Sequence, residues 1–106
     1  MVALDSAGDP VTVSPTQDNQ RNVIMWLDHR AIDQAQRIND TKHEVLSYVG
    51  GSISPEMEMP KLLWLKENLP VKCWKKCDLF LELPEFLTDR ATDNPTRLAF
   101  YDPRNP

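Results

Sequence analysis

The sequence is poor in glycine and cysteine, and it contains no long apolar run. Its three glycines do not form the Gly-rich loop that cradles a phosphate group. No stretch approaches the ~20 apolar residues that span a bilayer. The opening residues, "MVALDSAGDP", lack the positive and apolar regions of a signal peptide. These absences argue against a nucleotide-binding loop formed by these residues alone, and they predict a cytoplasmic protein with no membrane partner.

An excess of positive charge is also missing. The chain has 12 Lys and Arg against 16 Asp and Glu, and its net charge is -4. Binding to a phosphate backbone needs a clustered basic face. The local basic cluster is small and is expected to be a solvated face: Lys72, Lys75 and Lys76. The composition therefore predicts no nucleic-acid partner.

The two cysteines, Cys73 and Cys77, lie four residues apart. On a helix they share a face, where a disulfide is geometrically awkward, and in a reducing cytosol free thiols are expected. A metal site needs more ligands, and His29 and His43 lie too far away in the sequence to complete a known spacing. We therefore predict neither a disulfide nor a metal site.

At 106 residues the chain is long enough for one domain.

The first elements of the chain are predicted to be β-strands. The runs "VALD" and "PVTVS" flank a turn at Gly8-Asp9 and predict a hairpin. After a polar loop, the nearly continuous apolar run "VIMWLD" (residues 23–28) predicts a strand that is buried on both faces in the middle of a sheet.

Helices dominate the rest of the chain. From Arg30 the apolar period becomes helical, and the stripe Ala31, Ile32, Ala35 and Ile38 is expected to pack on the sheet. Thr41 and Glu44 form a predicted capping box for a short helix that ends at Gly50.

A third helix is predicted over residues 59–68 and a brief strand over residues 79–81. A fourth helix is expected to open at Pro84 and to close near residues 93–94, before an irregular end.

This inventory predicts an α/β fold that needs more strands than the sequence supplies. A hairpin and one buried strand, followed by several helices, leave a sheet with an exposed face and edge. The pattern therefore indicates a segment of a larger α/β domain.

The junction at residues 26–30 is the first candidate binding site, because ligands of open α/β sheets collect beyond the carboxyl ends of strands. Trp26 offers an apolar plane to a sugar or polyol, and Asp28 can accept hydrogen bonds from hydroxyls. The alternative is structural: Trp26 is core, Asp28 caps the helix, and Arg30 pairs with Asp28 or Asp33. The residues alone favour the structural alternative.

Glu56 and Glu58 precede the third helix and are placed to favour its N-terminus. Their spacing alone favours solvated acids of the first turn over a binding role.

Four blocks, "VIMWLDHRA", "RINDTKHEVLSYVGG", "PKLLWLKEN" and "LPEFLTDRAT", together resemble the N-terminal domain of the FGGY carbohydrate kinases, and most closely the D-ribulokinase-like members. The resemblance covers residues 2–97. It divides the chain into a partial kinase domain at residues 1–97 and a divergent tail at residues 98–106. It also offers an explanation for the missing strands, since the segment resembles the middle of the first domain.

The resemblance implies an actin-like, ribonuclease-H-like fold with two domains hinged around a cleft, in which the ATP γ-phosphate passes to a sugar hydroxyl. ATP and Mg²⁺ are the implied cofactors, and D-ribulose or a related pentulose or polyol is the implied small-molecule partner. Trp26 and Glu56 match positions that line the sugar site in similar kinases. Asp28 and Arg30 also match the family pattern, with Arg30 expected to support the structure.

The resemblance is incomplete in ways that affect function. The family's Asp-Gly-Thr phosphate-binding turn is expected before "MVALD", its general base is expected beyond the matching region, and "LAFYDPRNP" departs from the family pattern. We therefore predict no catalytic residue here, no ATP-binding groups and no kinase activity in this chain alone, as for a truncated gene model, a splice product or a cloned fragment. A non-enzymatic sugar-binding or interaction module is the alternative. The identity of the sugar and a homo-oligomeric state of the full-length protein stay open.

Overall fold

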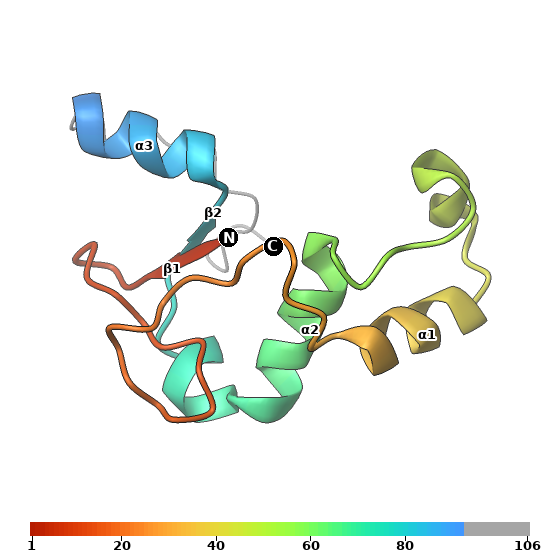
Figure 1. Cartoon of the computed structure of the whole chain (residues 1–106), viewed down its shortest axis with the longest axis horizontal. Helices are drawn as coiled ribbons and strands as arrows, with labels where there is room; N and C mark the ends of the chain where they lie inside the picture. Colours follow the sequence, from red (N-terminus) through yellow and green to blue (C-terminus); the bar gives the residue numbers. More distant parts are fainter. Residues whose placement is uncertain (93–106) are drawn as a thin grey trace.

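The computed structural model describes residues 1–92 of the chain (Figure 1). In chain order the elements are β1 (Val2–Leu4), α1 (Ile32–Asp40), the 3₁₀ helix η1 (Glu44–Val49), α2 (Glu58–Asn68), the π-helical turn η2 (Pro70–Trp74), β2 (Leu79–Leu81) and α3 (Leu83–Thr92). The predicted tail at 98–106 and the predicted end of the last helix lie outside the described residues. The α/β class is confirmed, as are the third helix and the strand at 79–81, to within one residue.

The sheet consists of β1 and β2, paired antiparallel with Ala3 opposite Phe80. Because successive side chains point to opposite faces of a strand, Ala3 and Phe80 share one face. They belong to the main apolar cluster with residues of α2 and η2. The residues on either side of them in each strand form a second cluster, against which Phe86 of α3 packs. This small sheet is therefore covered on both faces.

The predicted hairpin forms as a turn, but only one of its arms is a strand. The Asp5 N–H donates to the Asp9 carbonyl oxygen at 2.9 Å, and Gly8 takes the positive φ of 83° that the turn requires. Beyond the turn, pairing continues through an isolated bridge between Leu4 and Pro10. Pro10 has no N–H to extend the ladder.

The predicted buried strand at residues 23–28 is wrong. Ile24 is buried, but Met25, Trp26 and Leu27 are exposed. In the part of the chain that the structure describes, this segment pairs only through an isolated bridge between Val2 and Val23 and neighbouring backbone hydrogen bonds. A continuous apolar run predicts burial on both faces only if other elements cover it, and within residues 1–92 nothing covers 25–27.

The main core lies between α2, η2 and the sheet. It contains Met1, Ala3, Val11, Val13, Ile24, Leu62, Leu65, Leu69, Cys73, Cys77 and Phe80, with Trp64 and Trp74 packed against it. Both cysteines are free and buried, which confirms the prediction of free thiols. Burial raises the pKa of each thiol to about 12, so both stay protonated at neutral pH.

Helix α1 packs on α2 and not on the sheet, which corrects the sequence prediction (Figure 1). Of its predicted stripe, Ala31 and Ala35 are buried while Ile32 is exposed. Charged contacts complete the pairing of the helices, since Arg37 Nη1 donates to Glu67 Oε2 at 2.9 Å. This contact with Arg37 holds the pKa of Glu67 at about 2.

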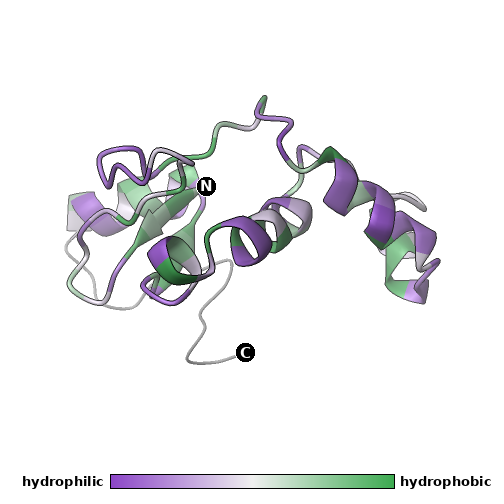
Figure 2. Cartoon of the chain, turned by 90° about the horizontal axis from the view of Figure 1, so that it is seen from below, coloured by the Kyte–Doolittle hydropathy of each residue, from purple (hydrophilic) through white to green (hydrophobic). Residues whose placement is uncertain are grey.

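Helix α1 and η1 lie on the side of α2 that faces away from the sheet. They carry both hydrophilic and hydrophobic residues, whereas the strands are uniformly hydrophobic (Figure 2).

The predicted capping box of η1 is wrong, because its N-cap is His43, whose Nδ1 accepts from the Val45 N–H at 3.1 Å. The Thr41 hydroxyl instead donates to the Ile38 carbonyl oxygen of the preceding helix. The predicted stop at Gly50 is confirmed by its φ of 85°. Within residues 1–92, no helix is long and apolar enough to cross a membrane.

Two carboxyl groups meet where α2 begins and α3 is about to begin. Burial, and then the neighbouring Glu82, raise the pKa of Glu58 to about 7. Glu58 Oε2 and Glu82 Oε1 are both buried without a hydrogen-bond partner. Two ionised carboxylates can only accept hydrogen bonds, so they cannot bond to each other. A proton on Glu58 supplies the donor that a hydrogen bond between Glu58 and Glu82 needs.

We expect the Glu58–Glu82 pair to make the free energy of unfolding decrease as pH rises. A carboxyl group whose pKa is raised on folding stabilises the folded state below its unfolded pKa, and this stabilisation is lost as pH rises through the folded value. Urea unfolding should therefore show a loss of stability between about pH 4.5 and pH 7. Glu58→Gln should flatten that slope, whereas Glu44→Gln, at an exposed position, should leave it unchanged. An identical slope in Glu58→Gln would contradict the assignment.

Candidate functional site

The side chain that organises the candidate site is Lys61 of α2, which is only 1% exposed. Its Nζ donates to the carbonyl oxygens of Met25, at 3.0 Å, and Trp26, at 3.4 Å. A buried ammonium group needs such acceptors, because an unpaired buried charge is strongly unfavourable. This contact fixes the irregular segment at residues 25–26 against α2.

A tight turn follows, in which the Asp28 N–H donates to the Met25 carbonyl oxygen at 3.0 Å. The Asp28 carboxylate accepts from the Arg30 backbone N–H at 3.0 Å and from Arg30 Nη2 at 2.7 Å. The Arg30 guanidinium also donates to the Val13 carbonyl oxygen and lies 4.7 Å from the ring centre of Trp64.

The hydrogen bond from Arg30 lowers the pKa of Asp28 and outweighs the opposing effect of burial. The Asp28–Arg30 pair of the structural alternative is thus confirmed. Because its pKa is lowered, the Asp28 carboxylate stays ionised at neutral pH. Asp28 does not cap α1, whose first residue is Ile32 and whose N-cap, Ala31, has no side-chain bond.

Trp26 is not a core residue, which corrects the structural alternative for it. Its exposed fraction is 66%, although its carbonyl oxygen is held by Lys61. An indole with a fixed backbone and an open face can stack on the C–H face of a sugar ring or chain.

Glu56 approaches this segment through His29. His29 Nε2 lies 2.9 Å from Glu56 Oε1, and the two side chains are 51% and 41% exposed. The Glu56 N–H is bound to Ser54 Oγ at 3.2 Å. Glu56 lies before α2, so the acid of the first turn is Glu58 alone. The sequence placed His29 at the junction but gave no signal for its contact with Glu56.

These contacts join two parts of the chain that are distant in sequence. Lys61 and the His29–Glu56 pair connect residues 25–30 with the segment that leads into α2. Together the two segments offer, on the surface of the molecule, an aromatic plane, two carboxylates and an imidazole, which suit a polyhydroxylated ligand. Among residues 1–92, no group of three or more His, Cys, Asp or Glu is arranged to hold a metal ion.

The chain is homologous to FGGY carbohydrate kinases, as the sequence predicted. It is 58% identical over 92 residues to the human FGGY carbohydrate kinase domain-containing protein, a match that covers 87% of this chain and 17% of the relative. The protein of the same name from Xenopus laevis is 53% identical over 92% of this chain and 18% of the relative. A D-ribulokinase from Saccharomyces cerevisiae is 41% identical over 84% of this chain and 12% of the relative.

No family model matches the chain. The chain spans less than a fifth of the length of these curated relatives.

We expect Lys61→Met to destabilise the chain. The substitution keeps an apolar stem but leaves the carbonyl groups of Met25 and Trp26 without their donor, at a cost of about 1–3 kcal/mol. Urea unfolding followed by circular dichroism measures the loss, and Lys72→Met, at an exposed lysine, is the matched control. Equal stability of the two variants would show that the Lys61 contact does not hold the segment.

Proposed function

We propose that the chain is part of the N-terminal domain of an ATP-dependent FGGY carbohydrate kinase, to which residues 1–97 contribute. The observation that supports this most is the contact between residues 25–30, which include Trp26, and the segment before α2, which includes Glu56. The family resemblance implies that both residues line the sugar site, and their segments are connected through hydrogen bonds from Lys61 to the Trp26 carbonyl oxygen and between His29 and the Glu56 carboxylate. The homology to proteins named carbohydrate kinases supports the same activity.

We propose D-ribulose, or a related pentulose or polyol, as the ligand of this surface. The name of the yeast relative, D-ribulokinase, supports a ribulose substrate. The chemistry agrees, because a linear polyol presents hydroxyl groups that donate to carboxylates and C–H groups that pack on an aromatic ring. Trp26 would pack against the carbon chain, while Asp28 and Glu56 would accept from hydroxyl groups.

Each proposed contact is already restrained by a neighbour. Arg30 keeps Asp28 ionised and orients its carboxylate, and His29 restrains one oxygen of Glu56. A carboxylate oxygen has more than one lone pair, so each group can still accept from a hydroxyl. Pre-ordered acceptors reduce the entropy lost when a flexible sugar binds.

The cofactors of this proposal are ATP and Mg²⁺, and the proposed location is the cytoplasm. In the two-domain arrangement that the resemblance implies, ATP and the sugar meet in a cleft between domains. We therefore propose that this chain supplies contacts on the sugar side only.

Sugar binding tests the proposed site. Addition of D-ribulose to the ¹⁵N-labelled chain should shift the amide resonances of Trp26, Asp28 and Glu56. Glu56→Gln removes a charged acceptor and should weaken binding by ~10-fold or more. Trp26→Ala should weaken binding similarly, whereas Tyr48→Ala, which removes another exposed aromatic ring, should not.

The outcome also separates the two candidate functions. Saturable shifts in the isolated chain favour the sugar-binding module, and the same contacts would then serve a kinase in a longer protein. Amide shifts that are unchanged in Trp26→Ala and Glu56→Gln would contradict the assigned site, both for a sugar-binding module and for a kinase.

Phosphate transfer is expected to be absent from the isolated chain. Mixed with ATP, Mg²⁺ and D-ribulose, the 106-residue chain should release ADP no faster than a sample without protein, because sugar-side contacts alone do not position the γ-phosphate. A coupled assay for ADP measures this. Turnover that depends on the sugar and is lost in Glu56→Gln would overturn the proposal that the chain alone is inactive.

A further inference from the structure

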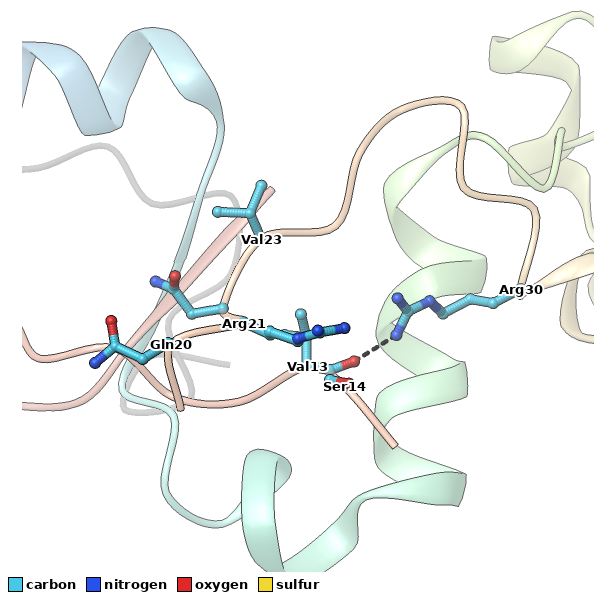
Figure 3. Close-up of a pocket in the computed structure, with 7 residues that line it drawn as sticks. Val13, Ser14, Gln20, Arg21, Val23 and Arg30 are labelled. Atoms are coloured by element: carbon cyan, nitrogen blue, oxygen red, sulfur yellow. Dashed lines mark hydrogen bonds between the residues drawn. The ribbon is translucent and has the colours of Figure 1, made fainter. Parts of the chain in front are cut away.

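A pocket of about 400 Å³ opens beside the loop at residues 13–23, and none of Trp26, Asp28 and Glu56 lines it. Its lining residues are Val13, Ser14, Gln20, Arg21, Asn22, Val23 and Arg30 (Figure 3). The volume falls within the range of small-molecule sites. Neither Arg21 nor this loop takes part in the sugar surface proposed above.

The pocket is positively charged. It has two arginines and no acidic residue in its lining, and the side chains of Arg21 and Arg30 point toward one another across it (Figure 3). Asp28 balances the charge of Arg30. The guanidinium of Arg21 has no hydrogen-bond or ion-pair partner within residues 1–92. One positive charge in the pocket is therefore uncompensated by the lining.

Both arginines have N–H groups to spare. A guanidinium has five donors. Arg30 uses its Nε and one N–H each of Nη1 and Nη2 for Asp28 and Val13, which leaves two donors. Among the described residues none accepts from the guanidinium of Arg21, which leaves all five of its donors. The hydroxyl of Ser14 and the amide of Gln20 add neutral polar groups at the same pocket.

The backbone around Arg21 is already ordered. Its N–H donates to the Asp18 carbonyl oxygen, and its own carbonyl oxygen accepts from the Val13 N–H, both at 2.9 Å. Nearby, the Thr12 N–H donates to Asn19 Oδ1 at 3.1 Å. The loop is thus held in place on both sides of Arg21, so a ligand would not have to order it.

We propose that this pocket binds a small phosphate-bearing molecule through Arg21 and Arg30. A phosphate group presents several strong acceptor oxygens in a tetrahedron and can accept from two guanidinium groups that approach from different directions. A carboxylate has two oxygens in one plane and matches a single guanidinium. Val13 and Val23 add apolar walls for the rest of the molecule. This pocket is distinct from the sugar surface proposed above, although Arg30 also pairs with Asp28 of that surface.

Titration of the ¹⁵N-labelled chain with inorganic phosphate, at constant ionic strength, tests the site. The arginine Nε–Hε resonances of Arg21 and Arg30 and the amide resonances of Ser14 and Asn22 should shift together and saturate. Acetate over the same range should leave them unsaturated. Glycerol 3-phosphate should shift the same resonances, with an added effect at Val23.

Variants show whether the arginine geometry or only the charge is responsible. Arg21→Gln should weaken phosphate binding at least tenfold, whereas Lys72→Gln, which removes the same charge at an exposed site, should have no effect. Arg21→Lys keeps the charge but loses the planar fork, and an intermediate affinity is expected; it also serves if Arg21→Gln fails to fold. Equal affinity in wild type and Arg21→Lys, a matching loss in Lys72→Gln, or saturation by acetate would overturn the proposal.

Discussion

The burial of one ammonium group, that of Lys61, is the constraint on which the rest of the arrangement depends. Its side chain comes from the first half of α2, and its nitrogen reaches the carbonyl groups of Met25 and Trp26. Within residues 1–92 no carboxylate forms an ion pair with it. Its charge adds to the larger effect of Arg30 in lowering the pKa of Asp28, and it opposes the rise in the pKa of Glu58. A segment without regular secondary structure is thereby held against a helix, and the candidate site is formed at that junction.

The elements that the sequence predicted well are those with local signals. Helix α2 has a proline in its first turn and a proline after its end, and Gly50 supplies the left-handed residue that stops η1. The strand at 79–81 is a short apolar run with polar residues on both sides. The run at 23–28 has the same local character, but whether it becomes a buried strand depends on neighbours, which the sequence does not reveal. The Thr41–Glu44 spacing failed for a similar reason, since His43 was available as a competing cap.

The candidate site shows the same division between local and distant contacts. The pair formed by Asp28 and Arg30 is two residues apart and was foreseen, while the contact of His29 with Glu56 joins residues that only the fold brings together. The pairing of Glu58 with Glu82 is equally long in range, and a single sequence carries no signal for it. Residue type thus indicated the candidate ligand-binding side chains, and tertiary structure decided what each one touches.

The small sheet has a consequence for how the chain acquires its structure during synthesis. Strand β1 lies at residues 2–4 and its partner β2 at residues 79–81, whereas α1 and α2 are near neighbours in sequence. Contacts between near neighbours form early, and contacts that close a long loop form late. During synthesis on the ribosome, α1 and α2 can therefore pack together before β2 has emerged to pair with β1. During that interval Val2 and Leu4, both buried in the finished fold, are exposed and available to a chaperone.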